Sequence, residues 1–323
     1  MEPAIATLPR PSSWTLRLPR GRRLALGGRR RPLVMGVLNL TPDSFSDGGR
    51  WTDPGRAVAR GLEMLEEGAD LLDLGAESTR PGGGTYGAGA QAVSAATELA
   101  RLLPVLEGLR AATDAPLSVD TRKGAVARAA LAAGADLVND VSLLGDPELG
   151  RAAAAAGCPL VLMHSRGELA TMQREIRFRD LLGEVRSELA DAAERAAGLG
   201  VDREQIVLDP GIGFGKTAEQ NLALLRRLDA FADLGRPLLV GASRKSFLGA
   251  LTGRPPADRL AGSLAAAAWA AAGGAAIVRA HDVAPTVEFL AVWAAIAAST
   301  ASGAAGAQGA GGGEDGDERS AAG

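Results

Sequence analysis

The chain has 323 residues, of which 46% are hydrophobic and 23% charged, a composition typical of a soluble globular protein. Its formal net charge of −3 gives no general attraction to nucleic acid or to an anionic membrane surface, so neither is expected as a partner. The single cysteine, Cys158, excludes an internal disulfide framework and favours a reducing compartment, so we expect a cytoplasmic protein.

The first predicted element is a β-hairpin within a basic N-terminal arm, residues 1–31. This arm contains eight arginines against one acid, Glu2, a bias that a transit peptide or a phosphate-binding arm would also have. The segment WTLRLPRGRRLALGG, however, alternates polar and apolar residues about a PRGR turn. This alternation favours an edge hairpin whose arginine side chains are solvated.

Short runs rich in Val, Leu and Ile follow the arm, separated by longer amphipathic segments rich in Ala. The predicted strands are residues 33–39, 70–75, 116–120, 136–140, 159–164, 205–209, 237–242 and 275–281. Apolar residues in the intervening segments recur at three- and four-residue spacing, which predicts a helix after each strand. Alternating strands and helices over residues 32–298 predict a single (β/α)8 TIM barrel. A doubly wound open sheet is the alternative, but no G-x-G-x-x-G turn follows the first strand.

The last predicted region is a tail rich in Gly and Ala, residues 299–323, which is acidic near its end and expected to be disordered. The chain is therefore divided into an arm (1–31), a barrel (32–298) and a tail (299–323). The longest apolar stretch, LAAAAWAAAGGAAIV, is shorter than a membrane span, so no membrane partner is expected.

Most of the predicted strands gain a polar or charged side chain at their carboxyl ends. The clearest examples are Asn39, Asp120, Asn139, His164, Asp209, Lys245, Arg279 and His281. A single polar strand end would be an ordinary exposed terminus, but a series in phase favours a common site. In a βα barrel these strand ends meet on one face, where the active site is built.

Three of these residues suit a flat heterocycle. Asp120, Asn139 and Asp209 supply acceptors and an amide at the ends of buried strands, where a ligand with an amino group and a ring N–H would satisfy them. Lys245 adds a cation, either for a carbonyl oxygen of that ligand or for one of the aspartates.

Other residues suit a diphosphate. Arg279 and His281 lie two apart, so both side chains face the same side of the last strand, where Asn39 and Thr79 could join them. The chain has only two histidines, and no acid lies at metal-ligand spacing from either, which argues against a fixed zinc site. A Mg²⁺ ion carried by the diphosphate is the better prediction.

The segment DPGIGFGKT, residues 209–217, resembles a phosphate-binding P-loop. Pro210 stands where the motif requires its first glycine, so nucleoside triphosphate binding is not predicted. Its glycines instead allow Phe214 and the backbone to approach a flat ligand.

The motifs together resemble dihydropteroate synthase, of the pterin-binding barrel group. The two signatures are VMGVLNLTPDSFSDGG and LLDLGAESTRPGG, followed in order by LSVDT, LVNDV, LVLMH, LDPGIGFGKT, LLVGASRKSFLG and IVRAHDV. The resemblance implies condensation of 4-aminobenzoate with 6-hydroxymethyl-7,8-dihydropterin diphosphate in folate biosynthesis, giving 7,8-dihydropteroate and diphosphate. It also implies Mg²⁺ as cofactor and a homodimer, formed through the Ala-rich late helices.

The resemblance implies a role for each matching residue. The residues expected to bind the pterin are Asp120, Asn139, Met163, Asp209, Phe214 and Lys245. Those expected to bind the diphosphate are Asn39, Thr79, Arg279 and His281, with Asn39 also contacting Mg²⁺. The expected catalytic residues are Asp43, Phe45, Arg80, Pro81 and Lys245. Those expected at the aminobenzoate are Phe45, Pro81 and Ser243.

The chain departs from the family pattern at Ala76, where a second Gly is common, and at Leu169, where a Pro is common. Both lie outside the groups assigned to chemistry. Two other functions remain open at this point. A pterin-binding methyltransferase module that serves a corrinoid partner would need no diphosphate cradle, and a non-catalytic paralogue would bind pterin without turnover.

Overall fold

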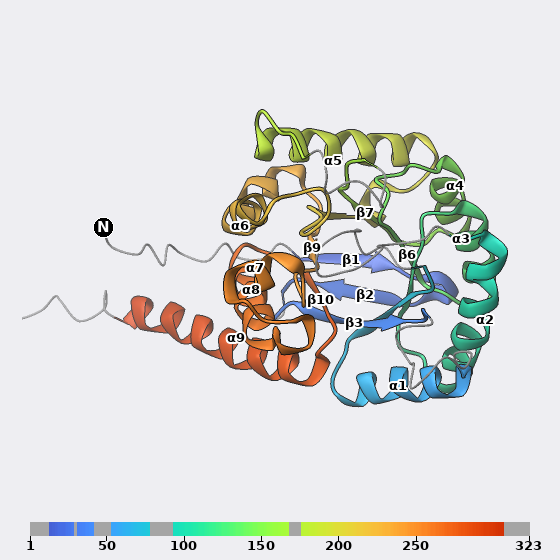
Figure 1. Cartoon of the computed structure of the whole chain (residues 1–323), viewed down its shortest axis with the longest axis horizontal. Helices are drawn as coiled ribbons and strands as arrows, with labels where there is room; N and C mark the ends of the chain where they lie inside the picture. Colours follow the sequence, from blue (N-terminus) through green and yellow to red (C-terminus); the bar gives the residue numbers. More distant parts are fainter. Residues whose placement is uncertain (1–12, 29–30, 42–52, 78–92, 168–175, 307–323) are drawn as a thin grey trace, which may run out of the picture.

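The computed structural model describes residues 13–28, 31–41, 53–77, 93–167 and 176–306 (Figure 1). Its central sheet has eight parallel strands in the order β8-β7-β6-β5-β4-β3-β10-β9. Their bounds are β3 (Leu33–Asn39), β4 (Leu71–Gly75), β5 (Leu117–Asp120), β6 (Leu137–Asp140), β7 (Leu160–Met163), β8 (Ile206–Asp209), β9 (Leu239–Val240) and β10 (Ile277–Ala280). A parallel bridge between Leu208 and Leu238 joins the two ends of this order, which confirms the predicted (β/α)8 barrel.

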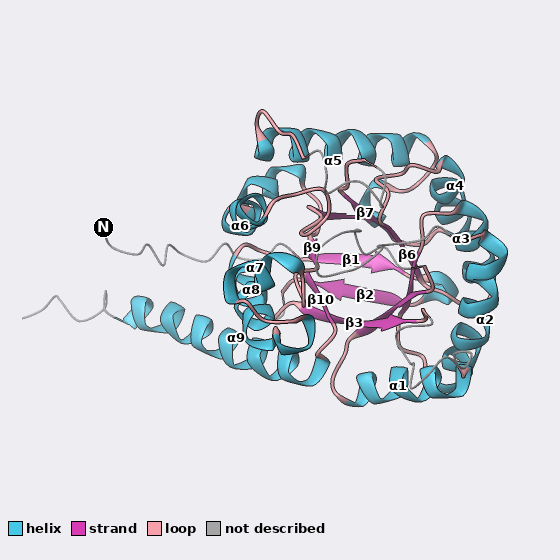
Figure 2. Cartoon of the chain, in the orientation of Figure 1, coloured by secondary structure: helices cyan, strands magenta, loops and turns pink. Residues whose placement is uncertain are grey.

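Helices surround the strands (Figure 2). They are α1 (Pro54–Glu66), α2 (Ala95–Ala112), α3 (Gly124–Ala132), α4 (Pro147–Ala156), α5 (Leu181–Gly198), α6 (Ala218–Arg226), α7 (Ser246–Thr252), α8 (Leu260–Ala272) and α9 (Val283–Gly306). The sequence sets several of their starts. The Asp53 side chain accepts from the backbone N–H of Gly55 before α1, and Thr217 and Gln220 form a reciprocal capping box before α6.

The N-terminal hairpin closes one end of the barrel. Strands β1 (Trp14–Arg17) and β2 (Arg23–Leu26) pair antiparallel, as predicted. Their buried leucines pack against residues in the amino-terminal halves of the barrel strands. This cluster contains Leu16, Leu18, Leu24 and Leu26 from the hairpin segment with Leu33, Met35, Leu71, Leu137, Val161, Val207, Leu239 and Ile277 from the barrel. The hairpin therefore covers the amino-terminal face, opposite the face where the predicted site residues lie.

The hairpin arginines Arg20 and Arg22 are solvated only in part, since their side chains are 44% and 25% exposed and also bind a buried acid. Both donate to Asp136, which precedes β6 and is fully buried. Arg110 of α2 also donates to this carboxylate, and the backbone N–H of Leu117 donates to its Oδ2 at 3.0 Å. The sequence could not reveal these contacts because the partners lie more than 110 residues from the hairpin arginines.

The last helix runs further than the sequence predicted. The expected boundary between barrel and tail at residue 299 falls inside α9, which continues to Gly306. The remainder of the predicted tail, residues 307–323, and residues 1–12 of the arm lie outside the described ranges. No helix within those ranges is both long enough and apolar enough to cross a lipid bilayer.

Candidate active site

Arg279 of β10 joins two carboxylates at the carboxyl ends of the strands. Its Nε donates to Asp73 Oδ2 at 2.7 Å, and its Nη2 donates to Asp120 Oδ2 at 3.0 Å. Burial of the guanidinium lowers the pKa of Arg279, but Asp73 and Asp120 outweigh that effect and raise it overall. A protonated arginine thus bridges two neighbouring acids.

Asp73 of β4 is a site residue that the sequence analysis did not assign. It is fully buried, and its Oδ2 also accepts a hydrogen bond from Asn139 Nδ2 at 3.0 Å. This contact fixes the amide of Asn139, because the nitrogen edge faces Asp73. The other carboxylate oxygen of Asp73, Oδ1, has no hydrogen-bond partner among the described residues. An acid inside the apolar run LLDLG was the available signal, since a buried carboxylate needs a partner.

Two further strand ends hold carboxylates with displaced pKa values. Burial raises the pKa of Asp120 to about 7, although Arg279 opposes the change. Burial likewise raises the pKa of Asp209 to about 6, and the N–H of Gly211, which donates to Asp209 Oδ1 at 2.7 Å, partly offsets it. Buried acids with displaced pKa values in one place are a mark of a functional site. We refer to Asp73, Asp120, Asn139, Asp209 and Arg279 as the strand-end site.

An apolar cluster lies near this polar group. Val141, Met163 and Phe214 are buried against one another at the ends of β6, β7 and β8. The Nζ of Lys245 lies 3.9 Å from the centre of the Phe214 ring, a cation–π contact. Val141 also borders a cleft of about 470 Å³ and was not assigned from the sequence. The arrangement combines an apolar surface with acceptors, as a flat polar ring requires.

Ser243 and His281 are brought together at the ends of β9 and β10. Ser243 Oγ lies 3.0 Å from His281 Nδ1 and also accepts from the backbone N–H of His281 at 3.2 Å. On the family resemblance, the two residues serve different substrates, Ser243 the aminobenzoate and His281 the diphosphate. Their contact would place those substrates side by side.

Comparison with known proteins shows the family of the chain. Residues 35–281 match the family model described as pterin binding enzyme. The dihydropteroate synthase of Synechocystis sp. is 48% identical over 268 residues, covering 82% of this chain and 90% of that protein. The chain belongs to the dihydropteroate synthase family of pterin-binding enzymes. It is accordingly a transferase of that family, and the resemblance seen in the motifs is confirmed.

Solved structures of the family have the same fold. The dihydropteroate synthase of Xanthomonas albilineans with 4-aminobenzoic acid superposes with a TM-score of 0.80 at 47% identity, covering 88% of this chain and 98% of that one. A structure of dihydropteroate synthase from the same organism in complex with 7,8-dihydropteroate gives a TM-score of 0.75 at 44% identity, covering 87% and 98%.

Five predicted residues lie outside the described ranges, namely Asp43, Phe45, Thr79, Arg80 and Pro81. Leu169, one of the two departures from the family pattern, also lies outside them. Asn39 ends β3 and is half-buried. The described residues contain no group of three or more His, Cys, Asp or Glu that could hold a metal ion.

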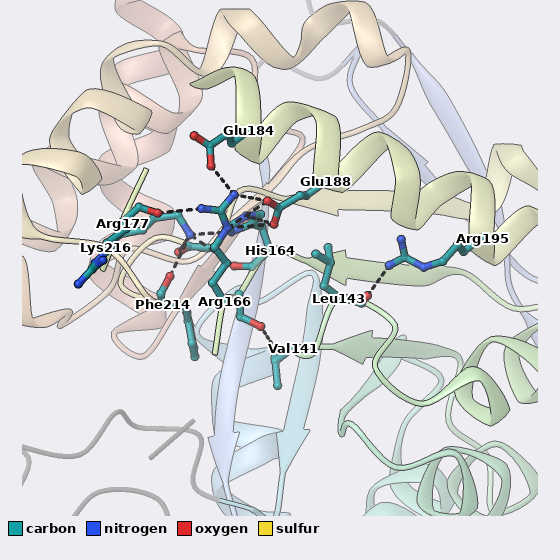
Figure 3. Close-up of polar contacts among 12 residues, drawn as sticks. Val141, Leu143, His164, Arg166, Arg177, Glu184, Glu188, Arg195, Phe214 and Lys216 are labelled. Carbon is teal, nitrogen blue, oxygen red and sulfur yellow. Dashed lines mark hydrogen bonds and ion pairs between the residues drawn. The ribbon is translucent and has the colours of Figure 1, made fainter. Parts of the chain in front are cut away.

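His164, one of the predicted polar strand ends, belongs to a separate network (Figure 3). It follows β7, is fully buried and contacts Lys216 and Glu188. Lys216 is the lysine of the DPGIGFGKT segment, so this lysine lies against a histidine and backbone carbonyls.

Proposed function

We propose that the chain condenses 4-aminobenzoate with 6-hydroxymethyl-7,8-dihydropterin diphosphate, releasing 7,8-dihydropteroate and diphosphate. The strand-end site is the observation that carries the proposal, because it joins buried acceptors, an amide and an arginine beside an apolar cluster. The Xanthomonas albilineans complexes with 4-aminobenzoic acid and with 7,8-dihydropteroate support the same substrates and product.

The pterin would lie with its ring against Met163 and Phe214. Its amino group and ring N–H would donate to Asp209 and Asp120, and the Asn139 amide would complete the polar edge. Lys245, which lies over Phe214, would meet the ring carbonyl oxygen. Each buried acceptor would gain the donor that it needs.

The diphosphate would lie between Arg279 and His281. Arg279 uses Nε and Nη2 for the two aspartates, which leaves Nη1 for a phosphoryl oxygen within the described part of the site. Asn39 would add a side-chain contact, together with Thr79. The Asn39 amide oxygen is a hard donor that fits Mg²⁺ as one ligand, so the ion would arrive with the diphosphate and neutralise part of its charge.

The chemistry needs no protein nucleophile. The C–O bond of the pterin methylene would break with its electron pair leaving on diphosphate, and the 4-aminobenzoate nitrogen would then form the C–N bond and lose a proton. Positive charge develops on the methylene carbon, where preorganised carboxylates are favourable. Negative charge develops on the leaving group, where Arg279 and His281 are favourable. Ser243, in contact with His281, would lie near the aminobenzoate carboxylate.

A homodimer is the expected assembly. Large apolar side chains are exposed on four neighbouring helices, α6 to α9, which lie together in Figure 1. They are Leu222, Leu251, Leu260, Trp269, Val292 and Ile296. A second copy of the chain would cover such a surface. The cytoplasm remains the expected compartment, and the buried state of the single thiol, Cys158, is compatible with it.

Diphosphate release tests the proposal. Purified protein would be mixed with both substrates and Mg²⁺, and diphosphate and dihydropteroate would be measured together. With both substrates present, equal amounts of the two products are expected, and no dihydropteroate is expected when either substrate is omitted. Pterin binding without any release would indicate a non-catalytic paralogue instead. Release of diphosphate without dihydropteroate when both substrates are present would contradict the condensation.

A further inference from the structure

Lys216 is a buried cation that the proposed reaction does not use. The residue is only 3% exposed, and its Nζ lies 2.9 Å from His164 Nδ1. The same atom donates to the carbonyl oxygens of Gly211 at 3.0 Å and of Phe214 at 2.9 Å. An ammonium group has three N–H donors, and these three close acceptors use all of them, with the carbonyl oxygen of His164 as a longer contact at 3.5 Å.

His164 completes the arrangement (Figure 3). Burial, together with the smaller effects of the Lys216 and Arg166 charges, lowers the pKa of His164 to about 2, so the ring is neutral. Because Nδ1 accepts from the ammonium, the ring proton must be on Nε2, which lies 3.1 Å from Glu188 Oε2. Glu188 is in turn held by Arg166, whose Nε donates to it at 3.0 Å.

The acceptors of Lys216 belong to the segment that carries two pterin residues. Gly211 has a φ of +69°, and a Cβ built at this position would lie 1.8 Å from the carbonyl oxygen of His164. Only glycine fits this close approach. The N–H of Gly211 donates to the Asp209 carboxylate, and the N–H of Phe214 donates back to the carbonyl oxygen of Gly211 at 3.1 Å.

We propose that Lys216 is a positioning residue of the pterin site. By donating to Gly211, Phe214 and His164, its ammonium holds residues 210–216 in the one conformation that presents the Asp209 carboxylate and the Phe214 ring together. The inference rests on the proposed function in one respect, since it takes a pterin as the ligand. It gives the P-loop-like segment a role that involves no phosphate.

The charge on Lys216 makes this role sensitive to pH. The pKa of Lys216 is lowered to about 7, mainly by burial. The carboxylates of Asp209 and Glu188 oppose the change. The positive charges of Arg166 and Lys245 favour it. The remaining titratable group in contact is His164, which stays neutral. A neutral amine has only two N–H donors, so loss of the proton removes one of the three hydrogen bonds.

Ring-nitrogen NMR tests the hydrogen bonds without any ligand. The chain has only two histidines, so a His281→Gln variant assigns the ¹⁵N signals of His164. We expect a neutral ring protonated on Nε2 at pH 6. In Lys216→Met the Nδ1 signal should shift, because Nδ1 loses its donor while Glu188 keeps the proton on Nε2. A ring protonated on Nδ1 at pH 6 would overturn the proposal, because Nδ1 could not then accept from Lys216.

Pterin binding tests the consequence. Calorimetry with 6-hydroxymethylpterin at pH 6 should give a Kd about tenfold or more weaker for Lys216→Met than for the wild type. Lys216→Gln keeps two N–H donors, so its Kd should lie between those of Lys216→Met and the wild type. At pH 8.5 the ratio of the Kd of Lys216→Met to that of the wild type should be smaller, because the wild-type lysine has then lost its proton.

A purely structural role gives a different pattern. Lys216→Met would then unfold at a lower temperature, yet its folded fraction would bind the pterin with the wild-type Kd at both pH values, and this result overturns the proposal. If Lys216→Met does not fold, Lys216→Gln carries the same test. Failure of the wild-type protein to bind the pterin would count against the proposed function, whereas the NMR result would still decide the hydrogen bonds.

Discussion

Asp73 links the two ligand-binding halves of the strand-end site. Through one oxygen it holds Asn139, expected at the pterin, and Arg279, expected at the diphosphate. Arg279 also contacts Asp120, so its removal would leave two buried carboxylates without their cation. Mutation of Arg279 would therefore disturb pterin binding as well as diphosphate binding. Asp73 offers the more informative substitution because it touches neither substrate in the proposed arrangement.

Asp73→Asn should weaken binding of the pterin diphosphate by about 1.5–3 kcal/mol, roughly ten- to a hundredfold, because a charge-assisted hydrogen bond to Arg279 is lost. Calorimetry measures the effect. The matched control is Asp70→Asn, since Asp70 lies at the start of the same strand and bonds Arg31 and the backbone of Val34. Equal losses in both variants would mean that Asp73 acts through stability alone.

Asp120 should make stability depend on pH. Its folded pKa of about 7 exceeds the ordinary value of 3.8, so the folded state binds the extra proton. Stability from this group is therefore present below about pH 4 and is lost as pH rises toward 7. The free energy of unfolding, measured with urea, should decrease from pH 5 to pH 7.5 in the wild type. This decrease should be smaller in Asp120→Asn, by on the order of 1 kcal/mol. A variant with the same decrease as the wild type would refute the assignment.

At the scale of elements, the barrel strands were predictable and several contacts between them were not. Strands buried on both faces give continuous apolar runs, which is why β3 to β10 were located to within one or two residues. The strand ends then indicated Asp120, Asn139 and Asp209. Asp73 was missed because it lies inside such a run, and its partner Arg279 is 206 residues away. Only the closure of the sheet brings β4 and β10 close together.

The β1–β2 hairpin is expected to stabilise the barrel without affecting ligand binding. Leu16→Ala removes a fully buried side chain at the floor of the barrel and should lower the free energy of unfolding by about 2–5 kcal/mol. Thr15→Ala, on the exposed side of the same strand, should change it by less than about 0.5 kcal/mol. Urea unfolding measures both variants, and the pterin Kd should be unchanged in each. Weaker pterin binding in Leu16→Ala would show that the two faces of the barrel are coupled.

At the scale of the whole molecule, the exposed apolar side chains of α6 to α9 set the expected assembly. Trp269 of α8 is 59% exposed, and Trp269→Glu should convert a dimer into a monomer in size-exclusion chromatography with light scattering. The control is Ala155→Glu, which places the same charge at an exposed position of α4, beside the groove between α3 and α4. If only Ala155→Glu dissociates the dimer, the interface lies at that groove and not on α6 to α9.

The hairpin that covers the barrel floor also bears on the order of folding. Its strands leave the ribosome before any barrel strand, yet the leucines that they bury must wait for Leu239 and Ile277, near the other end of the chain. The hydrogen bond from the backbone N–H of Arg17 to Gln205 likewise cannot form until Gln205, 188 residues away, has been synthesised. Contacts between such distant residues carry a large loop-closure cost and form slowly. During synthesis these leucines therefore reach their full burial only when the barrel is nearly complete, and until then the hairpin can pack only against the early strands.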